Sequence, residues 1–358
     1  MRAPLKILII GTLPPPLGGV TVLLNYLIES LQTRTDVDVQ AVDTGIVRGH
    51  GLGGLLKSFR AALQIVGAVP RADVVTLHCA TSSIAIKGTF VLLLAKLFRK
   101  PIVIRKFGGA DYGQSGARGW WPALAAFVLR RADIYFAETK QLVEQAHQRG
   151  LKHAEWFPNH RPLLNESADE DASIPRQRCR RFIYVGHVRE CKGIEVLAEA
   201  ARQLPDDVSI DVYGPWFDDL DRALFNDIPT IRYCDSLRSE EVIPTMRRYD
   251  AFVFPTHHAG EGYPGAVLEA FSANLPIVAT RWRALPEIVD DRVGLLIEPR
   301  NPTQLAEAMV KLADDTDLYQ RLRRNTQDRA EFFSVKHWTN EFVRRCEALR
   351  RGDRTHSH

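Results

Sequence analysis

Residues 252–269 read FVFPTHHAGEGYPGAVLE, an apolar strand pattern followed by a glycine-rich turn and the beginning of a helix. The strand pattern ends at Pro255, and the helical pattern begins near Ala266. Free N–H groups and the helix dipole make such a helix start attractive to phosphates, and glycines let a ligand approach the backbone closely. This stretch therefore predicts an α/β domain with an anion site in the second half of the chain.

The alternation of short strands and helices extends through all 358 residues, which is enough chain for two domains. The predicted strands are Lys6–Ile10, Val37–Val42, Val74–Leu77, Ile102–Arg105, Ile134–Ala137, Phe182–Val185, Val208–Tyr213, Ile231–Cys234, Ala251–Phe254 and Pro276–Ala279. The predicted helices are Val20–Leu31, Ile84–Phe98, Pro122–Arg131, Gly193–Gln203, Ser239–Tyr249, Ala266–Asn274, Thr303–Leu312 and Val335–Leu349. We predict two doubly wound α/β domains that bind ligand at the carboxyl ends of their strands, in the crevice between them.

A polar, acidic stretch separates the two halves of the chain. It covers residues 165–173, with Pro162 and Pro175 on either side, and is typical of a linker. The predicted organisation is an N-terminal Rossmann-like domain over 1–160, a linker over 161–180, a C-terminal domain over 181–334, a helix over 335–350 and a polar tail over 351–358.

The composition favours a protein of the reducing cytosol. The five cysteines are scattered and form no C-x-x-C pair, which argues against a disulfide framework or a zinc site. The apolar run Phe90–Ala95 is interrupted by Lys96 and is much shorter than a bilayer span, and the N-terminus has no export signal. We therefore expect a cytoplasmic protein, either soluble or peripheral to the membrane.

Charge is distributed unevenly between the halves. Residues 1–165 contain 20 Lys and Arg against 10 Asp and Glu, whereas residues 166–358 contain 27 against 33. The basic half suggests an anionic partner, and a membrane surface or a phosphate-bearing acceptor fits better than nucleic acid, for which no motif is present. An ordinary solvated surface is the alternative.

Two apolar features of the first half bear on this choice. The stretch Thr89–Leu97 is interpreted as a helix of the core rather than as a membrane-inserting segment. Trp120 and Trp121 follow Arg118 and are either an anchor at headgroup depth or a buried packing pair.

The glycine-rich turn carries two glutamates that suit a nucleotide-sugar ligand. Gly262 and Gly265 permit close approach of the backbone, and Glu269 is placed to accept hydrogen bonds from ribose hydroxyls. Glu261 lies on the loop before the helix and is placed to reach the sugar. Two solvent-facing glutamates beside an ordinary turn are the alternative interpretation.

The pair Glu261 and Glu269 resembles the Glu-x7-Glu signature of the retaining GT-B glycosyltransferases of group 1, family 4. The segments that follow, LPIVAT at 275–280, LPEIV at 285–289 and GLL at 294–296, are similar to this family as well. The resemblance covers about residues 180–345 and, more weakly, the first half. It implies an acceptor-binding N-terminal domain, a donor-binding C-terminal domain and a last helix that crosses back to the N-terminal domain.

The resemblance also assigns donor contacts. In the loop VGHVRECKG at 185–193, Lys192 stands at the position of the family lysine that contacts the donor phosphates. His187 replaces the usual arginine, and Arg189 is the substitute candidate. The remaining predicted donor-binding residues are Gly18, Gly19, Gly186, Gly262, Tyr263, Gly265, Ala266, Val267 and Glu269.

The catalytic histidine of many relatives has no direct counterpart here. It precedes a glycine in the family, whereas Phe107 precedes Gly108 in this chain. The role then falls to His78, Arg105 or Asp111, of which His78 is expected at the end of the strand Val74–Leu77. A structural hydrogen bond is the alternative role for His78.

The activity that the resemblance implies is transfer of a sugar with retention from a UDP- or GDP-linked donor to a hydroxyl of a glycan or lipid-linked acceptor, in bacterial polysaccharide or glycolipid biosynthesis. No cofactor and no metal ion are expected, since the chain has no Asp-x-Asp motif. The predicted catalytic residues are Glu261, Lys192, Arg189, His78 and Asp111. A nucleotide-sugar epimerase and a catalytically silent nucleotide-sugar-binding protein are the alternatives.

Overall fold

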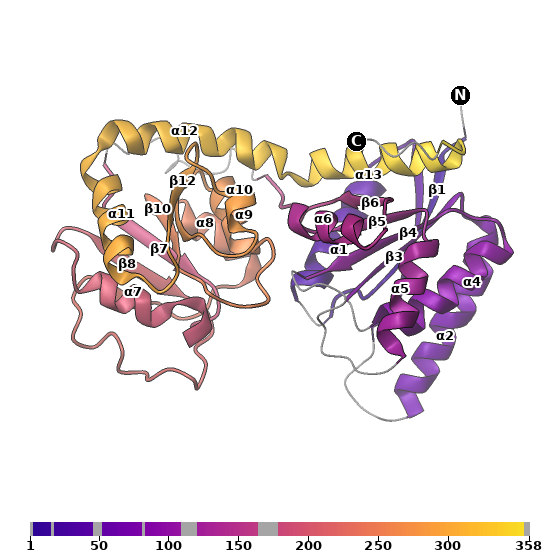
Figure 1. The fold of residues 1–358 in the computed structure, drawn as a ribbon, viewed down its shortest axis with the longest axis horizontal. Coiled ribbons are helices and arrows are strands. Elements are labelled where there is room, and N and C mark those ends of the chain that lie inside the picture. Colours follow the sequence, from indigo (N-terminus) through magenta and orange to yellow (C-terminus); the bar gives the residue numbers. More distant parts are fainter. Residues whose placement is uncertain are drawn as a thin grey trace. The chain divides into compact units, whose positions relative to one another are not determined.

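The structure is a computed structural model that describes residues 3–15, 18–45, 52–80, 83–108, 120–163 and 178–353. The chain forms two units (Figure 1). Unit 1 comprises Met1–His160 together with Val335–His358, and unit 2 comprises Arg161–Ser334. Each unit is built on a parallel six-stranded sheet, so the predicted architecture of two doubly wound α/β domains is confirmed.

The sheet of unit 1 has the strand order β2-β1-β3-β4-β5-β6. Its strands are β1 (Leu5–Gly11), β2 (Val37–Asp43), β3 (Val74–Ala80), β4 (Ile102–Phe107), β5 (Ile134–Ala137) and β6 (Ala154–Trp156). Its helices are α1 (Gly19–Gln32), α2 (Leu52–Ala68), α4 (Thr89–Leu97), α5 (Trp121–Arg131), α6 (Lys140–Gln148) and α13 (Val335–Arg350), with short helical turns η1 (Val69–Arg71) and η2 (Ile84–Gly88). The five predicted strands of this half are confirmed, whereas β6, α2 and α6 were not predicted.

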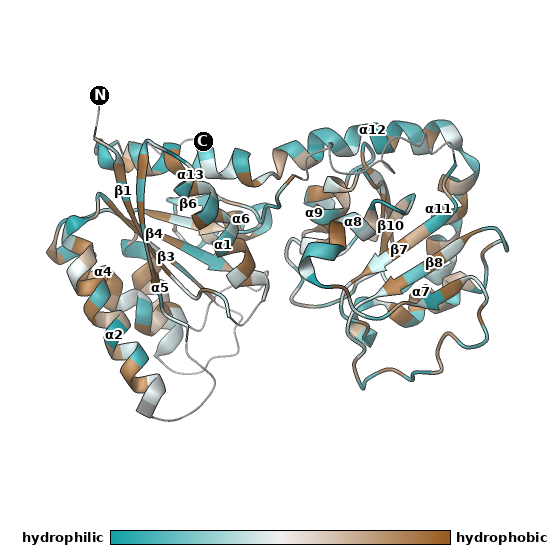
Figure 2. Cartoon of the chain, turned by 180° about the vertical axis from the view of Figure 1, so that it is seen from behind, coloured by the Kyte–Doolittle hydropathy of each residue, from teal (hydrophilic) through white to brown (hydrophobic). Residues whose placement is uncertain are grey.

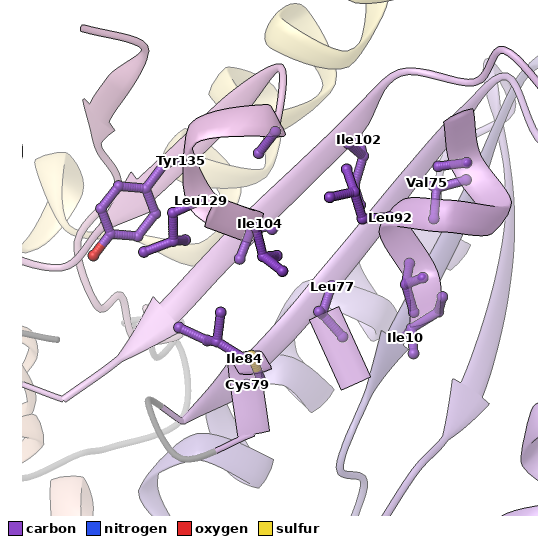
Figure 3. Packing of buried hydrophobic residues seen from close by; sticks show 14 of the residues in the cluster. Ile10, Val75, Leu77, Cys79, Ile84, Leu92, Ile102, Ile104, Leu129 and Tyr135 are labelled. Atoms are coloured by element: carbon purple, nitrogen blue, oxygen red, sulfur yellow. The ribbon is translucent and has the colours of Figure 1, made fainter. Parts of the chain in front are cut away.

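Apolar side chains cover both faces of this sheet, as a buried parallel sheet requires. Along β1, Ile7 and Ile9 pack toward α1 and α13, whereas Leu8 and Ile10 pack toward α2, α4 and α5. Figure 2 shows the strands of unit 1 as predominantly hydrophobic. Figure 3 shows the second of these layers, in which Leu77 and Ile104 meet side chains from the covering helices.

The sheet of unit 2 has the order β12-β11-β10-β7-β8-β9. Its strands are β7 (Arg181–Val185), β8 (Ser209–Tyr213), β9 (Ile231–Tyr233), β10 (Ala251–Phe254), β11 (Ile277–Thr280) and β12 (Gly294–Ile297). Its helices are η5 (Glu190–Lys192), α7 (Ile194–Ala201), η6 (Ser239–Glu241), α8 (Val242–Met246), α9 (Gly265–Ser272), α10 (Leu285–Ile288), α11 (Pro302–Asp314) and α12 (Thr316–Phe332). The predicted strands are confirmed to within one or two residues, whereas β12, α10 and α12 were not predicted.

The strand order gives unit 2 a topological switch point. From β7 the chain moves outward through β8 to β9, and it then returns to β10 on the other side of β7. Strands β7 and β10 are neighbours, and the loops that leave their carboxyl ends therefore run in opposite directions. Ligands of doubly wound sheets bind at such a point.

The last two helices belong to different units. Helix α12 packs against α9 in unit 2, and α13 packs against α1 and β3 in unit 1. The predicted return of the C-terminal helix to the N-terminal domain is therefore confirmed. Within unit 2, the Arg161 N–H donates a hydrogen bond of 3.0 Å to the Phe333 carbonyl. The chain passes from one unit to the other before Arg161 and after Ser334, and these two points are therefore close together.

In the described part of the chain, no helix is long and apolar enough to cross a bilayer.

Candidate functional site

Two predicted site residues meet at the switch point of unit 2. The Lys192 Nζ, in the loop after β7, lies 2.7 Å from Glu261 Oε2, in the loop after β10. The Thr256 hydroxyl donates to the same carboxylate oxygen at 2.7 Å. The side chain of Lys192 is 16% exposed and that of Glu261 is 8% exposed. The ion pair is therefore largely removed from water, and each charge depends on the other.

A glycine brings these two loops into contact. Gly193 follows Lys192 and has φ +77°, and a Cβ at this position would lie 2.1 Å from the Pro255 carbonyl oxygen. Only glycine tolerates both the left-handed conformation and this close approach. The His257 N–H also donates to the Cys191 carbonyl at 3.0 Å. The backbone therefore fixes Lys192 beside the β10 loop.

Helix α9 begins four residues after Glu261, at Gly265, with open backbone amides. Pro264 precedes the helix and offers no side-chain cap, and the Val267 N–H bonds back to the Pro264 carbonyl at 3.2 Å. Within the described residues, the N–H groups of Gly265 and Ala266 make no hydrogen bond. These groups and the helix dipole form the anion site that the sequence predicted.

Arg161 covers the first turn of α9, which the sequence did not predict. Its Nε donates to Glu269 Oε1 at 2.7 Å, and the two side chains are 9% and 21% exposed. A Cβ on Gly265 would lie 1.8 Å from the guanidinium of Arg161. A side chain at position 265 would therefore have to displace the guanidinium from its place beside Glu269. No pattern around Arg161 signals a partner that lies 108 residues away.

Tyr263 is oriented toward the interior of unit 2. It is 2% exposed, and its hydroxyl donates to Glu287 Oε2 at 2.6 Å. Glu287 lies in the LPEIV segment that resembles the family, so this segment supports the loop that carries Glu261. The Tyr263 side chain therefore supports the loop from inside unit 2 and does not face a ligand.

Arg189 is directed toward the loop after β8. Its Nε lies 3.2 Å from Asp219 Oδ2, its guanidinium lies 5.0 Å from the centre of the Phe217 ring, and its side chain is 39% exposed. The loops after β7 and β8 also touch, because a Cβ on Gly214 would lie 1.8 Å from the Gly186 carbonyl oxygen. Arg189 is therefore paired with Asp219 and does not join the Lys192–Glu261 ion pair.

Two histidines border the ion pair as neutral groups. Partial burial, and then the positive charge of Lys192, lower the pKa of His187 and of His258 below the usual value, although Glu261 acts in the opposite direction. Both imidazoles are therefore uncharged near pH 7. Lys192 then supplies the positive charge at this end of β7 and β10.

The predicted glycines of unit 1 lie at the beginning of α1. Gly18 precedes the helix, its N–H donates to the Thr21 hydroxyl at 2.9 Å, and Gly19 is the first helical residue. Both glycines are exposed. Asp111 lies outside the described residues.

A charged group after β5 was missed by sequence reasoning. Glu138 is 5% exposed and accepts a hydrogen bond of 2.9 Å from the Gly108 N–H. The Lys106 Nζ donates to the Gly108 carbonyl at 2.9 Å. The position of Glu138 directly after a predicted strand was the available signal.

His78 lies within β3 and not at its end, contrary to the prediction. The strand continues to Ala80, which pairs with Phe107 of β4. His78 is 1% exposed and lies 6.3 Å and 6.0 Å from the rings of Phe107 and Phe342. Its Nε2 is 3.1 Å from the Thr76 hydroxyl, and its Nδ1 has no hydrogen-bond partner among the described residues. The side chain is part of the packing beneath α13.

Arg105 is the neighbour of His78 on β4 and is equally buried. Its Nη2 donates to the Pro158 carbonyl at 3.2 Å, and its guanidinium lies 4.6 Å and 4.5 Å from the ring centres of Phe107 and Phe157. Burial lowers the pKa of Arg105 to about 9, with an opposing effect from Glu138. Burial, and then the charge of Arg105, lower the pKa of His78 well below its usual value.

Two parallel α/β units with a C-terminal helix that returns to the first unit define the GT-B fold. Residues 179–315 match the family described as "Glycosyl transferases group 1", which places this part of the chain in that family. A sulfoquinovosyl transferase of Arabidopsis thaliana is 24% identical over 271 residues, which cover 70% of this chain and 51% of that protein. A D-inositol 3-phosphate glycosyltransferase of Corynebacterium kroppenstedtii is 28% identical over 167 residues, which cover 42% of this chain and 36% of that protein.

Solved structures show the same fold over nearly the whole chain. The Anabaena protein HepE, determined in complex with UDP, matches with a TM-score of 0.73 at 15% identity, covering 96% of this chain and 100% of that one. The curated relatives are matched over about half of their own length or less. The comparisons therefore show the fold of the chain and the family of residues 179–315, and the substrates are a matter for proposal.

The Lys192–Glu261 pair leads to a prediction about turnover. In Lys192→Gln the amide still donates a hydrogen bond to Glu261 but leaves this largely buried carboxylate without a counter-charge, so unit 2 should lose up to about 3–5 kcal/mol of stability. The kcat is therefore measured at a temperature at which the variant is shown to be folded. The kcat for release of nucleotide diphosphate should fall by about 10²-fold or more, because leaving-group charge loses its counter-ion. Arg189→Gln is the control, since an exposed pair contributes at most about 1 kcal/mol to stability. A larger loss of kcat in Arg189→Gln than in Lys192→Gln contradicts the assignment.

His78 leads to a prediction about acid stability. The folded protein holds His78 neutral, whereas the unfolded chain takes up a proton as the pH falls through about 6.5. This group should therefore lower the free energy of unfolding by about 1.4 kcal/mol for each pH unit below 6.5 and contribute nothing to the pH dependence above it. Urea unfolding at pH 7.5, 6.5 and 5.5 should give a shallower dependence for His78→Gln than for the wild type. Equal dependences disprove the neutral state.

Proposed function

We propose that the chain transfers a sugar with retention from a nucleotide-diphosphate sugar to a hydroxyl of a glycan or lipid-linked acceptor. The observation that supports this most directly is the Lys192–Glu261 pair at the switch point of unit 2, next to the open N-terminus of α9. The match of residues 179–315 to the group 1 glycosyl transferases covers every residue of this arrangement except Arg161. In this proposal residues 181–334 form the donor-binding domain and residues 1–160 form the acceptor-binding domain.

The donor diphosphate is assigned to the start of α9 and to Lys192. As the glycosidic bond to the donor phosphate breaks, negative charge grows on the leaving oxygen. Lys192 and the amides of Gly265 and Ala266 stabilise that charge in a site that needs no rearrangement. Glu261 has two functions: it holds Lys192 in place, and its position one turn before α9 suits a contact to the donor sugar.

The nucleoside is assigned to Glu269. One carboxylate oxygen is held by Arg161, and the other, Oε2, makes no hydrogen bond within the described part of the chain. A fixed carboxylate with one open oxygen is suited to accept hydrogen bonds from two ribose hydroxyls. The base is proposed to be uracil or guanine.

The acceptor is assigned to unit 1 on the basis of charge and of the relatives. Residues 1–165 have twice as many basic as acidic residues. The matched proteins include an O-antigen chain mannosyltransferase of Escherichia coli, at 28% identity over 144 residues. A glycan or lipid-linked acceptor and a peripheral position at the inner face of the membrane follow as the proposal. The role that a histidine plays in many relatives is left to Asp111, because His78 and Arg105 are both enclosed in the core.

The experiment that tests this function is a panel of UDP- and GDP-linked sugars with hydroxyl acceptors. Release of nucleotide diphosphate without any acceptor shows that the donor site is active, and NMR of the product shows whether the anomeric configuration of the donor is kept. An isomerised donor with no released nucleotide indicates an epimerase. Binding without either reaction indicates a silent binding protein. Both of these results contradict the proposal.

Glu269→Gln tests the ribose contact. Loss of a charge-assisted hydrogen bond should weaken binding of the bare nucleotide diphosphate by about 1–3 kcal/mol in calorimetry. Because this change also weakens the contact to Arg161, the matched control is Glu155→Gln in unit 1. Glu155 is paired with Arg345 in the same way, at 2.7 Å with both side chains 15% exposed. The control should lose comparable stability and keep its nucleotide affinity. Equal affinities for all three proteins remove Glu269 from the site.

A further inference from the structure

Helix α2 of unit 1 presents an apolar stripe on the side that faces away from the core. Leu55, Phe59, Leu63 and Val66 recur at helical spacing and are 72%, 61%, 56% and 42% exposed. The opposite side of the helix, which includes Ile65, packs against the sheet. A surface helix of a water-soluble domain normally has polar residues on its outward side. The stripe on α2 therefore faces something other than water.

The segment η2–α4 repeats this arrangement beside α2. Ile86, Phe90, Leu93 and Leu97 follow the same spacing and are 62%, 37%, 63% and 72% exposed. The prediction that Thr89–Leu97 is core was therefore wrong for one side of the helix, because both sides are apolar and only one contacts the sheet. Figures 1 and 2 show α2 and α4 covering the same face of the unit 1 sheet.

This face of unit 1, formed by α2, η2–α4 and α5, also lacks acidic residues. The three segments contain no Asp or Glu. They carry the basic residues Lys57, Arg60, Lys87, Lys96, Arg130 and Arg131. At the start of α5, Trp120 and Trp121 stack with ring centroids 3.8 Å apart and are 61% and 38% exposed, which favours an anchor over a buried pair. Lys57 and Lys96 are paired with Asp43 and Asp133 from outside these segments, and the face still has an excess of positive charge. Apolar stripes, this excess of positive charge and exposed indoles together match an anionic lipid surface.

A pocket opens between the two apolar stripes. It has a volume of about 230 Å³ and is lined largely by apolar side chains of α2 and η2–α4, with Ile10 of β1 at its floor. An apolar cavity of about 150 Å³ is enough to bind benzene. One end is polar: Lys57 pairs with Asp43 at 2.8 Å, and Lys87 donates to the Thr44 carbonyl at 2.8 Å. The pocket thus has an apolar body and a charged end, as a lipid does.

We propose that this face of unit 1 docks on an anionic bilayer and that the pocket between α2 and η2–α4 binds one hydrocarbon chain of a lipid. The stripes enter the acyl region, and the basic residues meet the headgroups. The inference rests on the proposed function only in that docking would bring a lipid-linked acceptor to unit 1. A second copy of the chain is the less suitable occupant, because α2, η2–α4 and α5 carry no carboxylate that could pair with the basic residues of the other copy.

Vesicle co-sedimentation of the full chain tests the docking. The wild type should bind vesicles of phosphatidylglycerol and phosphatidylcholine, bind less at high salt, and bind weakly to phosphatidylcholine alone. The double variant Leu63→Glu, Leu93→Glu removes exposed apolar contacts only, so it should fold normally and bind at least about tenfold more weakly. The control Leu163→Glu, at a 43% exposed leucine of unit 2, should bind like the wild type.

Two results overturn the docking proposal. One is equal vesicle binding by the wild type and the double variant, or no binding by either. The other is a dimeric wild type that becomes monomeric in the double variant without any change in vesicle binding, which identifies the face as a protein interface. Release of nucleotide diphosphate without vesicles reports on unit 2 alone, so failure of docking and failure of the proposed function are distinguishable.

A photoreactive lipid tests the pocket. Phosphatidylglycerol with a diazirine at the end of one acyl chain should label Ala61, Ala62 and Val91, which line the pocket. Ser58→Trp, at the exposed rim, should reduce that labelling severalfold and leave vesicle binding intact. Labelling confined to Leu63 and Leu93 on the outward stripes, or equal labelling in the variant, shows that the chain stays in the bilayer and overturns the pocket.

Discussion

The ion pair between Lys192 and Glu261 is the contact on which the candidate site depends. Its two members come from loops that leave neighbouring parallel strands, and they are held in contact by Gly193, which lies against the backbone at Pro255. A largely buried cation is costly unless a partner and hydrogen bonds compensate for its lost water. Glu261 and Thr256 supply this compensation, and the neutral His187 and His258 leave Lys192 as the centre of positive charge. A charge held ready in this way needs little rearrangement to meet a diphosphate.

The interior of unit 1 also contains buried polar side chains. Arg105 and His78 lie under aromatic side chains at the centre of the fold, where each raises the cost of charging the other. The outward side of the same unit is apolar at α2 and α4. Buried polar groups and exposed apolar groups are the reverse of the usual distribution in a folded protein. Both arrangements lower the free energy of unfolding. Such positions are commonly functional.

The sequence predicted the architecture because each strand of the two sheets is a short apolar run, and because the helix after β10 follows a recognisable turn. It placed Lys192 and Glu261 in one site, but not their mutual contact, which depends on the strand order. Arg161 was missed because its partner Glu269 lies 108 residues further along the chain, and such a contact leaves no local pattern. His78 was misplaced because Cys79 and Ala80 extend the pairing of β3 with β4, although neither looks like a strand continuation. The apolar run of α4 concealed its exposed side, since a helix that is apolar all round has no periodicity to reveal which side is buried.

The path of the chain imposes an order on biosynthesis. Unit 2 is a continuous segment, whereas unit 1 is interrupted by it and is completed by α13. That helix supplies Trp338, Phe342 and Cys346 to the core of unit 1, on the side of the sheet that also contains Ile7 and Ile9. Until α13 has left the ribosome, α1 alone covers this side of the first sheet, although unit 2 is already complete. Unit 1 is therefore begun first and finished after unit 2, and part of its apolar surface stays exposed for the time that synthesis of unit 2 requires.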